Sequence, residues 1–254
     1  MTKPVVIIGM GEMGGVFARA FLRSGYPVYP VVRGMALADV AAQTPEPELV
    51  LVAVAEAQID EILESMPDAW RDRLVLLQNE LLPANWLRFG LEPSVISVWF
   101  EKKKGADAKV IIPSPVYGRH AQPVVDALAS IGIPARVLSS EQELLFELVL
   151  KNVYILTTNI AGLKTGGNVG ELWAQHQSLA RRVAADVIRL QEKLSGEPLD
   201  ADALISGMVY AFEGDFEHQC TGRSASARLK RALGQAQEYG LRLETLEEIA
   251  QLGA

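Results

Sequence analysis

Three glycines near the start of the chain have the spacing of a phosphate-binding loop, Gly9-Met10-Gly11-Glu12-Met13-Gly14. The first glycine permits a sharp turn, the second lets an anion approach the backbone because it has no Cβ, and the third permits close helix–strand packing. An apolar run precedes the loop and a helical pattern follows it, which is the context this motif requires. The free N–H groups at the start of that helix attract phosphate. We therefore predict a dinucleotide site here, with a ligand-free glycine turn as the weaker alternative.

Lys151 and Asn159 interrupt a long apolar segment in the second half of the chain. A lysine inside a buried helix is costly unless it is paired or functional. The two side chains lie two helical turns apart and so face roughly the same way. When a ketone is reduced, negative charge builds on its oxygen, and an ammonium there stabilises the charge and supplies the proton. Lys151 is therefore a candidate general acid, although a lysine whose stem packs while its ammonium reaches water would give the same pattern.

Two further candidates follow predicted strands. Arg33 comes after the strand at residues 27–32, where an acidic residue holds the ribose of NAD and a basic one accepts the 2′-phosphate of NADP. We therefore favour NADP, and a solvated surface arginine is the alternative. Asn79 comes after the strand at residues 74–77, and ligands of open α/β sheets bind at the carboxyl ends of strands. An Asx turn would also explain this asparagine.

The elements that position these residues form an α/β pattern followed by a helical one. Apolar runs typical of buried strands cover residues 4–8, 27–32, 49–54, 74–77, 95–100, 109–112 and 135–138. The charged segment 101–105 is interpreted as a solvated hairpin, and Pro113-Ser114-Pro115 as the end of a strand. Helical patterns follow at residues 122–131, 141–158, 175–194, 201–212, 225–239 and 246–252, with a loop at 165–170. The predicted fold is α/β: an N-terminal Rossmann domain with a doubly wound sheet, residues 1–139, and an all-helical C-terminal domain, residues 140–254.

Composition limits the classes of function. With 254 residues, 49% of them hydrophobic, the chain is long enough for two domains, and its net charge of -7 argues against a nucleic-acid partner. The single cysteine, Cys220, excludes an intrachain disulfide and fits a reducing cytosol, and the three histidines lie too far apart in sequence to suggest a metal site. We expect no signal peptide, because a strand begins within a few residues of the N-terminus, and no apolar run of transmembrane length. These features predict a cytoplasmic protein with no membrane partner.

The layout resembles the ketopantoate reductase family, within the wider group of 6-phosphogluconate and β-hydroxyacid dehydrogenases. Residues 9–14 are similar to the opening of that family, and Arg33 to its basic residue after the second strand. Gln58 is similar to the glutamine of its Lys-Ala-x-Gln segment, and Gln78-Asn79-Glu80 to its Gln/His-Asn-Gly turn, whose asparagine binds cofactor and substrate. Residues 168–172 are similar to its Asn-Gly-Glu-Leu segment.

The resemblance implies an NADPH-dependent reduction of a small keto acid, as in pantothenate biosynthesis, at a site between the two domains. In that family a lysine polarises the ketone and a downstream asparagine binds substrate, and Lys151 and Asn159 are similar to these two residues. The same likeness assigns residues 9–14, Arg33, Gln58 and Asn79 to the cofactor. Ser224 stands near the place of a glutamate that contacts substrate in the family, and it is a candidate to bind the substrate weakly through its hydroxyl. The apolar helices of the second domain would suit a homodimer interface.

Several positions depart from the family pattern. Ala55 stands where the family has a lysine, Ile155 where it has an asparagine, and the residues around Ser224 include no carboxylate. Glu147 is an alternative register for the catalytic lysine. A substrate carboxylate needs a cation, which Arg223 or Arg228 would supply unless they are solvated helix charges. These departures keep a second function open, a non-catalytic dinucleotide-binding sensor or regulatory protein that has lost part of the reductase site.

Overall fold

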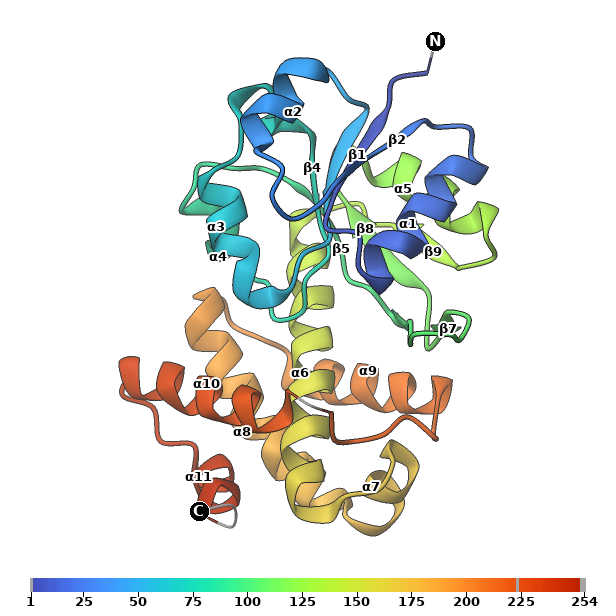
Figure 1. Cartoon of the computed structure of the whole chain (residues 1–254). Coiled ribbons are helices and arrows are strands. Elements are labelled where there is room, and N and C mark those ends of the chain that lie inside the picture. Colours follow the sequence, from blue (N-terminus) through green and yellow to red (C-terminus); the bar gives the residue numbers. More distant parts are fainter. Residues whose placement is uncertain (1, 223, 252–254) are drawn as a thin grey trace. The chain divides into compact units, whose positions relative to one another are not determined.

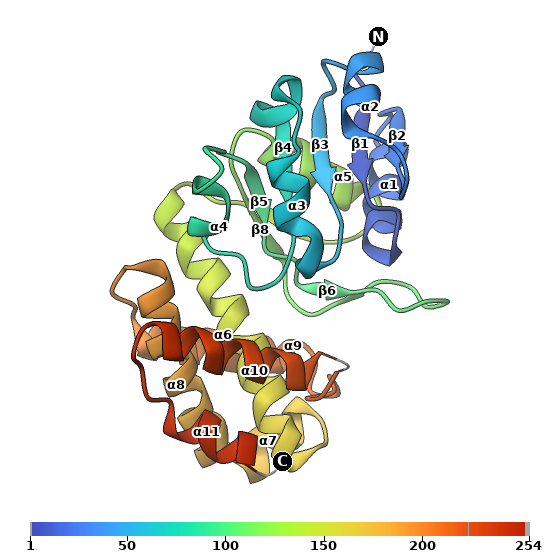
Figure 2. The same cartoon turned by 60° about the vertical axis from the view of Figure 1, so that its left-hand side comes forward.

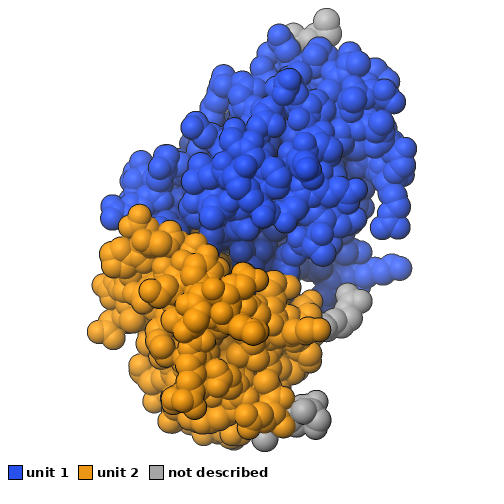
Figure 3. Space-filling model, turned by 90° about the vertical axis from the view of Figure 1, so that its left-hand side faces the viewer, with its two compact units in different colours: residues 1–147 blue, residues 148–254 orange. Residues whose placement is uncertain are grey.

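A computed structural model describes residues 2–222 and 224–251 of the chain. The chain divides into two compact units, residues 1–147 and 148–254, which Figure 3 colours separately. The first unit is α/β, and the named elements of the second are all helices. The predicted fold class is therefore confirmed. The domain boundary expected after residue 139 stays a prediction.

A seven-stranded sheet forms the centre of the first unit, in the order β2-β1-β3-β4-β5-β8-β9. The first five strands in this order are parallel, β8 is antiparallel to β5, and β9 is parallel to β8. The bounds are β1 Val5–Ile8, β2 Val28–Val31, β3 Leu49–Val52, β4 Leu74–Leu76, β5 Ser94–Ile96, β8 Ser114–Tyr117 and β9 Ala135–Val137.

Helices cover both faces of this sheet. Figure 1 shows α1 (Glu12–Arg23) and α5 (Ala121–Ser130) on one side and α2 (Leu37–Gln43) and α3 (Ile59–Glu64) on the other. Short helical segments complete the connections: η1 Glu56–Gln58, η2 Asp68–Arg73 and α4 Ala84–Leu87. The sheet is thus doubly wound, as the sequence predicts.

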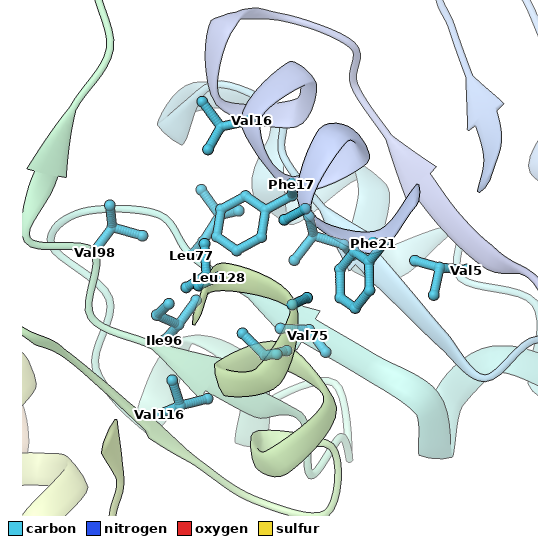
Figure 4. Close-up of a cluster of buried hydrophobic side chains, with 14 of the residues drawn as sticks. Val5, Val16, Phe17, Phe21, Val75, Leu77, Ile96, Val98, Val116 and Leu128 are labelled. Atoms are coloured by element: carbon cyan, nitrogen blue, oxygen red, sulfur yellow. The ribbon is translucent and has the colours of Figure 1, made fainter. Parts of the chain in front are cut away.

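The core under α1 and α5 explains why the apolar runs form strands. Phe17 and Phe21 of α1 are fully buried and pack over strand residues such as Val75, as Figure 4 shows. Each fully buried side chain of this size stabilises the fold by roughly 1.5–3 kcal/mol relative to its exposed state. This packing fixes the orientation of α1, and therefore the position of the loop that precedes it.

The strand predicted over residues 109–112 ends before Pro113, as expected, but a new strand, β8, begins at Ser114 within Pro113-Ser114-Pro115. The ladder between β5 and β8 pairs only Val95 with Tyr117 and Ile96 with Val116. Pro115 lies just beyond this ladder and contributes its carbonyl oxygen, which accepts a hydrogen bond from the Ser97 N–H at 3.0 Å. At this end of the pairing with β5, the missing N–H of the proline costs at most one hydrogen bond.

The strand predicted over residues 95–100 is shorter than expected. β5 ends at Ile96, and the Trp99 N–H donates to the side-chain hydroxyl oxygen of Ser114 at 2.9 Å, which is not a ladder bond to a backbone carbonyl oxygen. The chain then forms a separate antiparallel hairpin of β6 (Phe100–Glu101) and β7 (Lys109–Val110). Figure 2 shows this hairpin extending from the sheet, in agreement with the predicted hairpin at residues 101–105.

The second unit contains most of α6 (Glu141–Thr165) and five further helices in its described part. Helix α6 begins in the first unit and crosses the boundary at residue 148. The five further helices are α7 Val169–Gln175, α8 Gln177–Ser195, α9 Ala201–Gly214, α10 Ala225–Glu238 and α11 Glu244–Gln251. Helix α6 is longer than the predicted 141–158, because buried residues such as Ile160 and Ala161 continue its apolar face. The predicted loop at 165–170 overlaps α7, whose start is stabilised by a capping box between Asn168 and Glu171.

Helix α6 corrects the expectation that no segment has the length of a membrane span. It is 25 residues long, and its apolar window meets that criterion by length and hydropathy. Within this fold, however, 89% of the window is buried. Such burial is typical of the core helix of a folded unit.

Candidate functional site

The glycine loop at the end of β1 has the geometry that its spacing predicts. Gly9 has a φ of +93°, a left-handed conformation that favours glycine. A Cβ at Gly14 would lie 2.0 Å from the Gly9 carbonyl oxygen, so only glycine lets α1 pack this closely. A Cβ at Gly11 would have no neighbour within 4 Å. Since Gly11 is also the N-cap of α1 and provides no side-chain cap, the helix start is exposed to an incoming anion.

A hollow of about 540 Å³ lies beside this loop. It is lined by the loop, one face of α1, the β6–β7 hairpin and the segment after α5. From the hairpin, the Lys102 ammonium lies 3.5 Å from the Glu12 carboxylate in the first turn of α1. Lys102 also donates to the backbone carbonyl oxygens of Lys103 and Ala106, which hold its side chain.

Sequence reasoning missed Lys102, because it interpreted the charged hairpin as purely solvated. The ion pair with Glu12 joins residues 90 positions apart, and nothing in the local pattern specifies such a contact. The only available signal was the run of three lysines, Lys102-Lys103-Lys104. The structure adds a cation beside the start of α1 that the sequence did not assign to a site.

Arg33 and Gln58 lie after β2 and β3, next to the glycine loop in the sheet. Ile8 of β1 pairs with Val31 on one side and with Val52 on the other, so the three strands end at one edge. Both candidate side chains are exposed. The sheet thus brings together the three strand ends that precede the predicted cofactor residues.

The Gln78-Asn79-Glu80 turn after β4 is tied to the end of β3. Gln78 is buried and donates to the carbonyl oxygens of Val52 at 2.8 Å and Val54 at 3.2 Å. Asn79 donates from Nδ2 to Oε1 of Glu56 at 3.1 Å. Glu80 has a φ of +61°, the region that glycine favours, at the position where the family turn has glycine. The backbone at Glu80 therefore has the left-handed conformation that glycine favours.

Lys151 is buried within the second unit, on α6. Its ammonium lies 5.6 Å from the centroid of the Tyr154 ring, a cation–π contact one turn along the helix. The Tyr154 ring in turn packs against the rings of Phe212 and His218 at centroid distances of 5.6 and 5.9 Å. The candidate acid is thus carried by a rigid core helix and contacts an aromatic cluster.

Asn159, two turns further along α6, is buried and belongs to a polar cluster. Its Nδ2 donates to the Cys220 carbonyl oxygen at 3.1 Å, and its Oδ1 accepts from Nη1 of Arg228 at 2.8 Å. The Arg228 N–H donates to the carbonyl oxygen of Ser224, the exposed N-cap of α10. The side chain of Arg228 therefore links Asn159 of α6 to the first turn of α10, whereas Ser224 takes part through its backbone carbonyl oxygen alone. Arg223, the other candidate cation, lies outside the described residues.

The positions that depart from the family pattern are occupied as follows. Ala55 is exposed, and Ile155 is buried within α6. Glu147 forms an ion pair with Arg136 of β9, while burial, the larger effect, raises the pKa of its carboxyl group. If position 147 corresponded to the catalytic lysine of the family, the site would have a carboxyl group in place of an ammonium. A carboxyl group cannot supply that positive charge.

No protein-family model matches the sequence, and a search of curated proteins also found no match. Solved structures match over nearly the whole chain. A ketopantoate reductase of the PanE/ApbA family from Ralstonia eutropha has a TM-score of 0.68 at 15% identity, covering 98% of this chain and 96% of that one. The chain has the ketopantoate reductase fold.

Two further structures support this assignment of the fold. A 2-dehydropantoate 2-reductase from Methylococcus capsulatus has a TM-score of 0.68 at 13% identity, with 98% of this chain and 95% of that chain covered. D-mandelate dehydrogenase in complex with NADH also has a TM-score of 0.68 at 13% identity, covering 98% and 97% of the two chains. The predicted resemblance to ketopantoate reductases is thus confirmed for the fold.

Proposed function

We propose that this protein is a nicotinamide dinucleotide-dependent reductase of a small keto acid, with NADPH as its cofactor and Lys151 as its general acid. The observation that contributes most is the glycine loop. Gly11 leaves open space where a side chain would begin, at the uncapped start of α1. Phosphate groups bind at such helix starts through free N–H groups and the helix dipole. Structures with the same fold include one with bound NADH, D-mandelate dehydrogenase.

Each proposed cofactor residue has a distinct task. Residues 9–14 hold the diphosphate, Arg33 pairs with the 2′-phosphate, and Asn79 and Gln58 orient the half that carries the nicotinamide. Lys102 adds positive charge beside the diphosphate, which offsets the absence of a lysine at Ala55. Charge-assisted hydrogen bonds of this kind are roughly twice as strong as neutral ones.

The chemical step requires one proton from the protein. When bound, NADPH supplies a hydride to the ketone carbon. The Lys151 ammonium stabilises the negative charge on the carbonyl oxygen and donates its proton there, so the C=O bond becomes an alcohol. Lys151 then regains a proton from water. The buried position of Lys151 on a core helix keeps the ammonium in one place.

A second candidate is a dinucleotide-binding sensor or regulatory protein without reductase activity. The observation that favours it is the loss of polar groups where the family has them, at exposed Ala55 and buried Ile155. We prefer the reductase, because a protein that only senses dinucleotides would need the glycine loop but not Lys151 as well. Either protein would carry Cys220 as a free thiol, in keeping with the proposed cytoplasmic location. A homodimer is also part of the proposal, since one matched ketopantoate reductase is dimeric.

Loss of NADPH absorbance tests the proposal directly. The purified protein is mixed with NADPH and a panel of keto acids that includes ketopantoate. We expect one of them to be reduced, and Lys151→Ala to lower kcat by about 100- to 10,000-fold, the usual contribution of a general acid. Lys164→Ala, at the exposed end of the same helix, is the control. NADPH binding without turnover of any keto acid would favour the sensor instead, and unchanged turnover by Lys151→Ala would reject the assigned acid.

A further inference from the structure

A second hollow, of about 500 Å³, lies within the second unit. Three helices line it: α7 contributes Trp173, α8 contributes Arg181, and α9 contributes one stripe of its surface. The volume falls within the usual range for small-ligand pockets, about 300–1,000 Å³. None of its lining residues has a part in the proposed reductase chemistry. The chemistry of these walls therefore indicates a ligand other than the dinucleotide or the keto acid.

The α9 wall is charged at both ends and apolar between them. Asp202 lies in the first turn of α9 and Glu213 in its last turn. Their separation of 11 positions corresponds to about three turns and about 16 Å along the helix, so both carboxylates project from one face. Ile205 and Val209, both partly buried, lie between them on that face. The stripe thus presents two anionic ends joined by an apolar strip.

These two carboxylates are available to a ligand. Both are exposed, and within residues 2–222 and 224–251 neither Asp202 nor Glu213 forms an ion pair. Asp202 is stabilised by the positive end of the α9 dipole, but Glu213 lies at the negative end, where a carboxylate is unfavourable. The last turn of α9 holds no basic residue. A cation beside Glu213 is therefore favoured by the carboxylate and by the helix dipole together.

Two aromatic side chains of the hollow also favour a cation. Tyr210, one turn before Glu213, is 58% exposed. The Trp173 ring is held by the Phe212 ring at a centroid distance of 5.8 Å, and the Arg181 guanidinium lies 5.0 Å from the Trp173 centroid. Aromatic faces attract cations through their quadrupole. The face of Trp173 is thus already occupied by a positive group on an exposed, flexible stem.

We propose that this hollow binds a linear aliphatic polyamine such as spermine. One ammonium group pairs with Glu213 beside the Tyr210 ring, another pairs with Asp202, and the methylene chain lies along the apolar strip between them. A small metal ion would use neither the strip nor the rings. Arg181 competes with the ligand for the Trp173 face. The net charge of -7 adds a general attraction for polycations. This inference is independent of the proposed reductase function.

Calorimetric titration of spermine, hexylamine and putrescine into the full chain tests the proposal. The wild type is expected to bind one spermine, at least about tenfold more tightly than hexylamine, which has one charge, or putrescine, which is too short to reach both acids. Glu213→Gln and Asp202→Asn should each weaken spermine binding about three- to fivefold. Arg181→Ala should strengthen it at least about threefold, because it removes the competing cation.

Tryptophan fluorescence locates the bound ligand. Of the four tryptophans, only Trp173 is partly exposed, since the other three are buried: Trp70, Trp86 and Trp99. Spermine should therefore change the fluorescence over the same concentration range as the calorimetric signal. Binding without such a change would place the ligand elsewhere and overturn the proposal.

Two matched variants control for charge alone. Glu238→Gln removes an exposed acid from the end of α10, outside the hollow, and should leave spermine binding unchanged. Arg182→Ala removes the exposed arginine next to Arg181, which pairs with Glu248 at 3.4 Å, and should change the affinity less than about twofold.

The inference fails if spermine binds no more tightly than hexylamine, or if Glu238→Gln weakens binding as much as Glu213→Gln does. Either result would reduce the effect to unspecific attraction by a negatively charged protein. It also fails if Arg181→Ala and Arg182→Ala bind spermine alike. Failure of the proposed function is distinguishable, because the oxidation of NADPH by a keto acid is measured without any polyamine.

Discussion

Gly14 packs against Gly9 so closely that a Cβ at position 14 would lie 2.0 Å from the Gly9 carbonyl oxygen. Gly9 lies in the turn after β1 and Gly14 lies in the first turn of α1, and the obstructing atom belongs to the backbone, which cannot rotate aside. The contact sets the distance between the helix start and the strand end. The proposed diphosphate site depends on that distance.

Gly14→Ala should therefore destabilise the fold. Overpacking of this kind costs typically 1–3 kcal/mol, and we expect a loss of at least about 2 kcal/mol in urea unfolding. Gly15→Ala is the matched control in the same helical turn, where a Cβ would have no neighbour within 4 Å. It should stabilise the protein by about 0.5–1 kcal/mol, since alanine is the better helix former. Equal stability of the two variants would contradict this account of the turn.

Lys102 should contribute to dinucleotide affinity through its charge. Its ammonium lies 3.5 Å from Glu12 at the start of α1. We expect Lys102→Ala to weaken NADPH binding by about five- to tenfold, or about 1 kcal/mol, and to make the affinity less dependent on salt. Lys103→Ala is the control, because that exposed ammonium pairs with Glu101 within the hairpin. If both variants bind NADPH alike, the hairpin has no part in the site.

Arg33 should determine the choice between NADPH and NADH. The side chain is exposed after β2 and offers a planar guanidinium to a 2′-phosphate. Arg33→Ala is expected to weaken NADPH binding at least about tenfold, or 1.4 kcal/mol, and to leave NADH binding nearly unchanged. Arg23→Ala, an exposed arginine at the end of α1, controls for net charge. A wild-type protein that binds NADH as tightly as NADPH would refute the role of Arg33.

The elements that the sequence predicted correctly are those specified by local pattern. Residues 4–8 and 49–54 are apolar without alternation, and they contain the interior strands β1 and β3. The glycine loop likewise depends on its own residues and on the elements directly beside it. Helix α6 was predicted from its apolar surface, though not its full length, because burial of its last turns depends on packing against the rest of the second unit.

What the sequence did not predict depends on contacts between distant residues. Pro115 can occupy β8 because the pairing with β5 ends at Val116. No local sequence rule specifies where this pairing ends. Arg228 and Asn159 are 69 residues apart, so the orientation of this pair follows from the packing of two helices. The sequence thus identified candidate residues by their type, but it did not predict which distant residues they contact.

His120 should make stability fall at acid pH. Burial, the largest influence, lowers the pKa of its imidazole, while a hydrogen bond with the Asp72 carbonyl oxygen opposes this. The folded state therefore favours the neutral ring. Its contribution to stability is complete above the unfolded pKa of about 6.5 and is lost as the pH falls through the lower, folded value.

The comparison is between the wild type and His120→Gln, in urea unfolding from about pH 7.5 down to about pH 5. The wild type should lose more unfolding free energy over this range than the variant, which has no imidazole to protonate. His176→Gln, at an exposed position after α7, should behave like the wild type. Parallel pH profiles for the wild type and His120→Gln would show that the buried imidazole does not contribute.

The central claim is that a diphosphate binds against Gly11 at the start of α1, and calorimetric titration of NADPH into the wild type and Gly11→Val tests it most directly. Gly11 has φ −74° and ψ −167°, which valine adopts readily, and a Cβ there has no neighbour within 4 Å. The variant should therefore unfold within about 1 kcal/mol of the wild type. We predict saturable NADPH binding by the wild type and at least about tenfold weaker binding by Gly11→Val, a loss of 1.4 kcal/mol or more. Equal affinity of the two proteins, or a wild type that binds neither NADPH nor NADH, would contradict the account.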